Sequence, residues 1–519
     1  HIVAWNQSYC PTSLISIGFW PMFASSFFSF DSVSAWSDGA VVLLESNIFS
    51  NSKFRLMGEI KGDAPKSTAP SELFSSYQTA ILKVARYWEI IFGLTSTSSL
   101  STITDWEISY KAYPFYNITS GKFQMISVTN NTFETLTIYD SRPLFSITRD
   151  QLFTASSNTF KDLTVNFMRS DNITQYNALF RQYYDSNEFD TLISGVALTD
   201  NTFSDSLGAI ALITADQTAT YTQSTVSVNN DTGFTFANNI VTNYRIQLAL
   251  ITVSSRTRVT MTNNSISSIV QEFSLSTLPN TYSSITNNML VGIITLSSLT
   301  SGNVSTIANN TLTNVTTNFF SGITLSKCQN VFLSGTVSNV TFNVPNFGGL
   351  NVPYIRTSLC VAVYSSSNIS IDDFLCDQTN IVVAAQDKPM TQVSFGACLA
   401  GDVFLKLTSA TTNKISNFIC SNSQFILNGA QITDLESFPV RAMILENSPL
   451  ISVSNLLVAN VSSSVLIDIS ATTGTFDNCT FTNSTSYNMA SGLAISGSSV
   501  ISITSSSFSE LTCTDCEAI

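Results

Sequence analysis

The sequence predicts an all-β fold, a parallel β-helix whose coils are about 22–29 residues long. Asparagine pairs recur at short intervals, at 263–264, 287–288 and 309–310. Around them, apolar residues alternate with Ser and Thr. The chain has 519 residues, of which 44% are hydrophobic and only 11% are charged. Self-similarity at such a period is typical of solenoids, in which one structural unit stacks on the next.

Alternating polarity indicates short strands. The segments VSVNNDTGFTF (226–236) and RVTMTNNSISSI (258–269) place apolar residues at every second position, as half-buried strands do. Their β-branched residues also suit strands. Three such runs with their turns account for one coil, so we expect each coil to pair in parallel with the coils on either side. We expect right-handed winding, the commoner choice.

The two members of an asparagine pair have different expected positions. Successive side chains of a strand point to opposite sides, so Asn310 shares the inner side with Leu312, and Asn309 faces outward. An inward asparagine suits a turn, because Asn tolerates left-handed geometry. Its amide can also bond to the coils on both sides, as in stacked amide ladders. The predicted ladder residues are Asn131, Asn264, Asn288 and Asn310.

The N-terminal part departs from this pattern. We expect residues 1–110 to form an irregular or capping region with early coils, and residues 111–519 to form the β-helix, continuing into a cysteine-containing segment beyond 519. Apolar residues within 71–93 recur at helical spacing. They predict a short helix that caps or inserts beside the coils, since an open coil end is an unpaired edge. An irregular coil is the alternative.

The segment YNMASGLAISGSSVISITSSSFSELTCTDCEAI (487–519) resembles the right-handed β-helix repeats of large secreted surface proteins. Those repeats carry a small-Gly-apolar-Ile element, an alternating strand and a turn with Phe. SGLAI at 491–495 and SSSFSEL at 505–511 match that outline, although Asn is absent after Phe508. The resemblance covers residues 110–519 in outline, and it implies a fold and a location rather than an activity.

Fourteen Asn-x-Ser/Thr sequons occur, and each is an acceptor pattern for N-linked glycans. A single one arises easily by chance in a chain rich in Asn, Ser and Thr. The whole set, the low charge and the cysteines together favour the secretory pathway and an extracellular or cell-surface location. The sequon asparagines are Asn6, Asn117, Asn130, Asn172, Asn230, Asn263, Asn303, Asn309, Asn314, Asn339, Asn368, Asn460, Asn478 and Asn483.

The nine cysteines suit an oxidising compartment. Cys376, Cys398 and Cys420 lie 22 residues apart, so coils of that length would stack them above one another. Neighbouring coils are ~4.8 Å apart, within the range of a disulfide's Cα separation. Two of the three could pair, or all could be buried thiols. We expect Cys513 and Cys516 to form structural disulfides with a following segment.

The sequence lacks the motifs of β-helix enzymes. Glycoside hydrolysis needs two carboxylates that flank the bond, and the adjacent pair here is Asp372 and Asp373. In an alternating strand, one of these two faces outward. The single histidine is His1, and the Gly-His-Gly and Arg-x-Lys motifs of polygalacturonases do not occur. We therefore predict no enzyme activity, no cofactor and no metal site.

The charge pattern makes nucleic acid an unsuitable partner. The net charge is −13 and no basic run exists, whereas phosphate binding needs clustered Lys and Arg. No stretch of 18 or more apolar residues is present, so we expect no membrane span in this segment.

Two functional hypotheses follow. In the first, the chain is a non-catalytic extracellular structural glycoprotein, a rigid rod in a surface coat, filament, appendage or adhesin. Its partners would be N-linked glycans, further copies of itself or other extracellular structural proteins. In the second, it binds or degrades polysaccharides along one face. A line of exposed aromatic residues would favour the second hypothesis.

Overall fold

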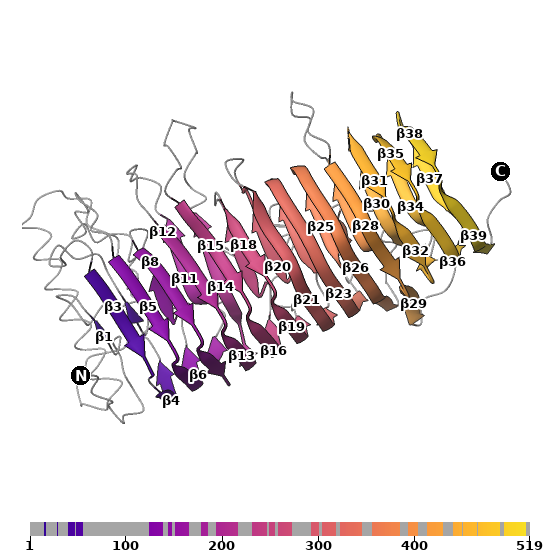
Figure 1. The fold of residues 1–519 in the computed structure, drawn as a ribbon. Helices are drawn as coiled ribbons and strands as arrows, with labels where there is room; N and C mark the ends of the chain where they lie inside the picture. The colour runs from indigo at the N-terminus through magenta and orange to yellow at the C-terminus, as the bar shows by residue number, and fades with distance from the viewer. Residues whose placement is uncertain are drawn as a thin grey trace, which may run out of the picture.

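The fold is taken from a computed structural model. It describes residues 15–16, 28–29, 40–46, 48–54, 124–138, 144–147, 151–165, 178–184, 194–215, 231–246, 249–254, 258–271, 292–299, 304–317, 322–344, 355–384, 393–402, 413–428, 440–448, 450–463, 465–487 and 492–514. Within these ranges every regular element is a β-strand. Figure 1 shows the strands side by side along an elongated body, with residues 40–54 at one end and residues 500–514 at the other.

The strands form three stacks, which we name the first, second and third ladders in the order in which a coil visits them. The first contains β3 (Ala40–Glu45), β5 (Gln124–Thr129), β8 (Gln151–Ser156), β12 (Ser194–Thr199), β15 (Asp231–Ala237), β18 (Val259–Thr262), β31 (Ile451–Ser454), β35 (Thr473–Asp477) and β38 (Val500–Thr504). The second contains β4 (Ile48–Phe54), β6 (Thr132–Ile138), β9 (Thr159–Lys161), β10 (Thr164–Val165), β13 (Thr202–Leu207), β16 (Ile240–Ile246), β19 (Ser265–Gln271), β29 (Gln424–Asn428), β32 (Leu457–Ala459), β33 (Ser462–Ser463), β36 (Thr480–Tyr487) and β39 (Ser507–Thr514).

Four longer strands belong to both the first and the second ladder, so these two ladders form one 25-stranded sheet. They are β21 (Ser305–Thr317), β23 (Gln329–Val344), β26 (Ser367–Ala384) and β28 (Asn413–Ser421). The third ladder is a separate 14-stranded sheet. It contains β1 (Ile15–Ser16), β2 (Phe28–Ser29), β7 (Phe145–Ile147), β11 (Ala178–Tyr184), β14 (Ala209–Ala215), β17 (Ile251–Ser254), β20 (Ile294–Ser297), β22 (Ile323–Ser326), β24 (Ile355–Ser358), β25 (Val361–Tyr364), β27 (Val393–Asp402), β30 (Val440–Glu446), β34 (Val465–Ser470) and β37 (Leu493–Ser496).

The described strands pair in parallel with their equivalents one coil away, as β12 does with β8 and β15, β23 with β21 and β26, and β34 with β30 and β37. The chain passes from the third ladder to the first and second and then returns, as in β20, β21, β22 and β23. The chain is a parallel β-helix. The predicted fold class is confirmed.

Coil length varies more than the repeat suggested. Coils that are in direct contact lie 27, 43, 38, 25 and 46 residues apart along the series from Asn131 to Asn310. The expected range of 22–29 residues therefore fits some coils, and others are longer. An interval of 43 residues, which looks like two coils, is one coil with extra residues between its strands.

Two features were predicted for the N-terminal part: early coils before residue 110 and a helix at 71–93. Strands β3 and β4 pair with β5 and β6, so a coil lies within the segment before residue 110. The predicted helix at 71–93 lies outside the described residues.

Apolar columns fill the interior, as inward residues of successive coils stack on one another. Phe133, Phe160 and Phe203 form one such column, with ring centroids 4.9 and 4.8 Å apart. Phe145 and Phe180 stack at 5.1 Å on the opposite wall, and all five rings are fully buried. Aromatic pairs of this kind contribute about 0.5–1.5 kcal/mol each beyond their buried area.

A column of buried asparagines lies at the corner between the first and second ladders. It runs through Asn131, Asn158, Asn201, Asn239, Asn264 and Asn310, which are 1–5% exposed. In each of the first five, the backbone N–H and the side-chain Nδ2 both donate to Oδ1 of the next asparagine, at 2.7–3.2 Å. Nδ2 also donates to a backbone carbonyl, as Asn201 does to Ala155 at 2.9 Å. The amides are thus saturated.

Asn264 donates directly to Asn310. Asn288, the predicted ladder residue between them in the sequence, lies outside the described residues. The 22–24-residue spacing predicted two coils between Asn264 and Asn310, whereas these two residues lie in adjacent coils 46 residues apart.

The cost of breaking this ladder can be measured in Asn201→Ala. The substitution removes the acceptor of the Asn158 backbone N–H and of one of the two Nδ2 protons, and leaves both buried and unpaired. Each such group costs about 1–3 kcal/mol, so we expect the free energy of unfolding to fall by roughly 2–4 kcal/mol. Denaturant unfolding of Thr202→Ala, a partly exposed neighbour, serves as the control. Equal stability of the two variants would contradict the structural role of the amide.

Candidate functional surface

Most coils of the 25-stranded sheet turn in the left-handed region at two positions that are five residues apart. Eleven described coils share this spacing, with φ between 46° and 57° at both positions. The pairs are Asn130 and Thr135, Ser157 and Asp162, Asp200 and Asp205, Asn238 and Asn243, Asn263 and Ser268, Asn309 and Asn314, Asp373 and Gln378, Asn417 and Asn422, Asn455 and Asn460, Asn478 and Asn483, and Ser505 and Glu510.

The residues at these corners follow from the backbone. A left-handed conformation costs an ordinary L-residue roughly 1–2 kcal/mol, and Asn and Asp adopt it most readily after Gly. Asn or Asp accordingly occupies most of the corner positions. The sequence reasoning missed this five-residue rule, although a repeated N-x-x-x-x-N at 309–314, 417–422, 455–460 and 478–483 displays it.

All nine described sequon asparagines have left-handed backbones and exposed side chains. They are Asn130, Asn263, Asn309, Asn314, Asn339, Asn368, Asn460, Asn478 and Asn483. The residue two positions later starts or continues a strand and points outward, where Ser or Thr is usual. The fold therefore generates sequons by itself. The other five, Asn6, Asn117, Asn172, Asn230 and Asn303, lie outside the described residues.

The exposed corner side chains bond to one another from coil to coil. Asn243 Nδ2 donates to Asp205 Oδ1 at 2.6 Å, and Asn339 Nδ2 donates to Asn314 Oδ1 at the same distance. Asn455 donates to Asn417 and Asn478 to Asn455, at 2.9 and 2.8 Å. In each case the donor lies one coil further along the chain than its acceptor, so the bonds form an outer ladder of one polarity.

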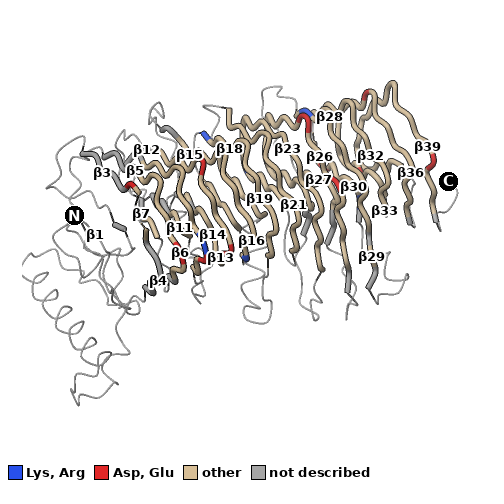
Figure 2. The backbone as a smooth tube through the Cα atoms, turned by 60° about the horizontal axis from the view of Figure 1, so that its bottom comes forward, with Lys and Arg blue, Asp and Glu red and all other residues tan. Residues whose placement is uncertain are grey.

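Hydroxyl side chains cover the sheet between the corners. In the second ladder, Thr202, Ile240, Ser265, Thr311 and Thr336 form one outward column in register. A second column runs beside it through Ser204, Thr242, Ser267, Thr313 and Ser338. Neither column carries a charge over these five coils. Figure 2 shows how few Lys, Arg, Asp and Glu the described coils contain.

Of the two adjacent acids, Asp372 serves as a hydrogen-bond acceptor. Asp372 Oδ1 accepts from Ser416 Oγ and Asn417 Nδ2, at 2.7 and 2.9 Å. Asp373 occupies the neighbouring left-handed corner with φ of 51°, so the two carboxylates do not form one site. Asp377 repeats the arrangement with Ser421 and Asn422. Within the described residues, no group of three His, Cys, Asp or Glu side chains could hold a metal ion.

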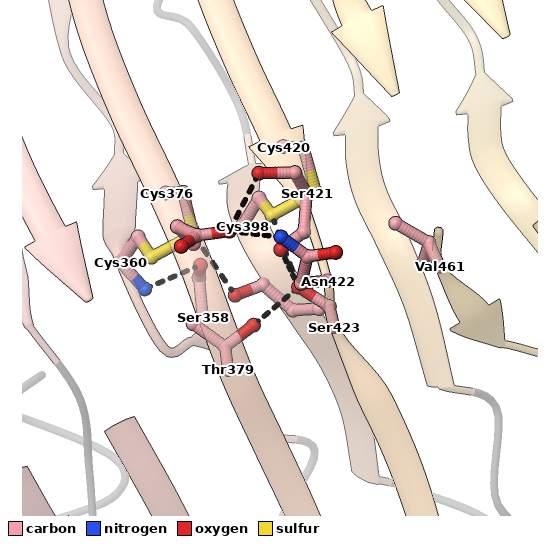
Figure 3. The surroundings of a disulfide bond; sticks show 12 residues. Ser358, Cys360, Cys376, Thr379, Cys398, Cys420, Ser421, Asn422, Ser423 and Val461 are labelled. Atoms are coloured by element: carbon pink, nitrogen blue, oxygen red, sulfur yellow. Dashed lines mark hydrogen bonds between the residues drawn. A yellow bond between two sulfur atoms is a disulfide. The ribbon is translucent and has the colours of Figure 1, made fainter. Parts of the chain in front are cut away.

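Two disulfides cross the interior from the third ladder to the second. Cys360 is bonded to Cys376 and Cys398 to Cys420, with Cα separations of 6.1 and 5.9 Å. Cys376 lies in register with Cys420. Cys360 and Cys398 directly precede the paired residues Val361 and Leu399. The two bonds therefore lie one above the other in neighbouring coils (Figure 3).

This arrangement differs from the expected stack of Cys376, Cys398 and Cys420. The 22-residue spacing is not the coil length here, because Cys376 and Cys420 are in register across 44 residues. Cys398 consequently lies on the opposite wall, where it reaches Cys420 across the core. Cys376 pairs with Cys360, which the spacing argument left out.

The remaining described cysteines differ in state. Cys328 and Cys479 are buried and free, and burial raises the pKa of the Cys328 thiol to about 11. Burial also raises the pKa of Cys479. Cys513 is disulfide-bonded, with a partner outside the described residues. Cys516, which was predicted to form a disulfide as well, also lies outside them.

The third ladder contributes little exposed surface. Its outward column of Thr252, Thr295, Thr324, Ala362 and Ala400 is 1–5% exposed. The accessible face of the described coils is therefore the 25-stranded sheet with its corners. Within the described part of the chain, no helix is long and apolar enough to cross a bilayer.

Comparisons with known proteins add little. No protein-family model and no curated protein matches this chain. Among solved structures it is similar to PfbA, a surface adhesin of Streptococcus pneumoniae. The identity is 12%, the match covers 73% of this chain and 84% of the other, and the TM-score is 0.26. A score this low carries no argument about function, and the fold rests on the strand pairings.

Ser268→Asn tests the outer ladder. Ser268 has φ of 56° and lies between Asn243 and Asn314 in the second corner column. Asparagine tolerates this geometry better than serine does, and its Nδ2 can donate to the preceding coil. We therefore expect the free energy of unfolding to rise by about 1 kcal/mol. Thermal and denaturant unfolding measure it. Ser267→Asn, on the neighbouring strand residue, should give no gain, and an equal gain there would contradict the corner argument.

The disulfide pairing can be mapped by mass spectrometry of non-reduced peptides. We expect Cys360–Cys376 and Cys398–Cys420, and a Cys376–Cys420 link would show that the structure is wrong here. Replacing both Cys360 and Cys376 with Val should lower the free energy of unfolding by about 2–4 kcal/mol, as loss of a disulfide typically does. Cys328→Val, at a buried free thiol, is the control for changes in core packing.

Proposed function

We propose that this chain is a non-catalytic extracellular structural glycoprotein, a rigid β-helical rod that serves in a surface coat, filament, appendage or adhesin. One observation carries the proposal: the exposed polar side chains of the corners bond to the neighbouring coil. Asp372, Asn417 and Asn455 form one such series. The side chains that could perform chemistry are thus used to hold coils together.

The compartment is supported by the interior disulfides. Bonds of this kind persist in oxidising environments and are rare in the cytosol. The uncharged hydroxyl columns fit the same location, because attached glycans are bulky and solubilising and would supply the hydration that charges supply elsewhere.

A polysaccharide-binding or polysaccharide-degrading rod is the alternative. It would require a line of exposed aromatic side chains along one face. Among the exposed large apolar side chains of the described residues, Phe508 is the one aromatic, and it lies in β39 of the last described coil, where its ring stacks on Phe481 at 4.7 Å. The others are aliphatic: Ile495, Val500 and Ile503 lie with Phe508 in β37–β39, and the rest, such as Ile48 and Val304, lie in other coils. No observation favours the alternative.

An activity assay separates the two hypotheses. Purified full-length protein is incubated with a panel of polysaccharides, and released reducing ends or unsaturated sugars are measured. We expect no release above a heat-denatured control. Release that disappears in Asp372→Asn with Asp373→Asn, in a variant that still folds, would overturn the proposal.

Electron microscopy tests the shape. Thirteen coils are described in the first ladder, and at ~4.8 Å per coil they predict a rigid section on the order of 60 Å long. Negatively stained secreted protein should show rods, either free or joined in a coat or filament. Compact particles without an elongated axis would contradict the rod.

A further inference from the structure

The nine described sequon asparagines share a backbone conformation but differ in what their amide nitrogens do. In seven of them Nδ2 donates to the side chain of the preceding coil. Asn130 donates to Ser46, Asn263 to Asn238, Asn339 to Asn314, Asn368 to Asn330, Asn460 to Asn422, Asn478 to Asn455 and Asn483 to Asn460. These seven nitrogens belong to the outer ladder.

Asn309 and Asn314 are different. Both side chains are exposed, and neither Nδ2 has a hydrogen-bond acceptor among the described residues. Ser268 is the residue of the preceding coil that lies opposite Asn314. The Asn314 Nδ2 forms no hydrogen bond with the Ser268 hydroxyl. Asn314 takes part in the ladder only through Oδ1, which accepts from Asn339. The two free nitrogens lie five residues apart on β21, at the two corners of a single coil.

N-glycosylation takes place at this atom. The Asn side-chain nitrogen attacks C1 of a sugar held on an activated glycosyl pyrophosphate. The new C1–N bond replaces the C1–O bond, the pyrophosphate leaves, and the nitrogen loses one of its two protons. The modified nitrogen therefore has one N–H and one bulky substituent.

A ladder position has little room for this substituent. Asn339 Nδ2 lies 2.6 Å from Asn314 Oδ1, and Asn478 Nδ2 lies 2.8 Å from Asn455 Oδ1. A sugar on either nitrogen would start against the corner of the preceding coil, and successive corners are only ~4.8 Å apart. Glycans on two neighbouring members, such as Asn460 and Asn483, would also meet each other.

We propose that Asn309 and Asn314 are the glycan-bearing asparagines among the described corners, and that the other seven sequons are structural and remain unmodified in the folded protein. This inference rests on the proposed function, since it requires passage through the secretory pathway. Asn309 and Asn314 would place two glycans on one coil at opposite margins of its strand.

Site-specific glycopeptide analysis is the test. The full chain is secreted from eukaryotic cells, trimmed to a single sugar per site, digested and quantified by mass spectrometry. We expect Asn309 and Asn314 to be occupied and the seven ladder asparagines to be unmodified. Glycans on any of the seven, or bare nitrogens at Asn309 or Asn314 while other sequons are occupied, would overturn the inference and leave the proposed glycoprotein intact. A protein without any glycan would overturn both.

Matched variants remove sequons without disturbing a corner. Thr311→Val and Thr316→Val destroy the Asn309 and Asn314 sequons at outward strand positions, and each should lose one glycan in a mobility shift. Thr341→Val and Thr485→Val do the same for Asn339 and Asn483, and should lose none. A glycan lost in either of the last two would contradict the assignment.

Ser268→Asn offers a gain-of-contact test. It places an amide acceptor below Asn314 and so should draw that nitrogen into the ladder. We expect lower glycan occupancy at Asn314 and unchanged occupancy at Asn309, measured in the same digest. Unchanged occupancy at Asn314 would show that ladder bonding does not control modification, and would overturn the inference.

Discussion

The hydrogen bond that follows many of the left-handed corners is the contact on which the rest of this β-helix depends. After such a turn, the next backbone N–H points into the core and needs an acceptor. An inward side chain of the following coil supplies it. Asn239 does this for Asn201 and Ser206 for Leu163, and Asn413 does it for Ile369. The same rule therefore accounts for buried Asn and Ser in an otherwise apolar interior.

Because each corner bonds only to the corner of the adjacent coil, the connections elsewhere are free to change length. Equivalent corners of neighbouring coils lie as few as 23 and as many as 84 residues apart along the chain, yet the five-residue spacing between the two corners is the same in eleven coils. The contacts that hold adjacent coils together are thus confined to the short segment that contains the two corners. Insertions can accumulate after the second or the third ladder without disturbing the register of the 25-stranded sheet.

The interior changes along the rod while the corners stay constant. Stacked phenylalanines fill the coils around Phe160 and Phe203, and two stacked disulfides occupy the equivalent space around Cys376 and Cys420. A crosslink between opposite walls takes the place of phenylalanine in this column, while Phe374 and Phe418 of the same two coils stack at 5.5 Å beside it. On the outside, the corner amides join coil to coil, so architecture and surface are made from the same residues.

Local periodicity was enough to predict the parallel coils, the inward position of Asn131, Asn264 and Asn310, and the outward position of their neighbours, because alternation and left-handed tolerance are properties of a few consecutive residues. It could not predict which coils touch. The regular spacing of the asparagine pairs and of the cysteines gave the wrong coil length for one reason: chain distance equals coil length only where no residues are inserted. The partners of Cys360 and Cys420, and the difference between the free nitrogen of Asn314 and the bonded one of Asn339, were decided by the stacking of coils. These contacts join residues far apart in the chain, and only the tertiary structure brings them within bonding distance.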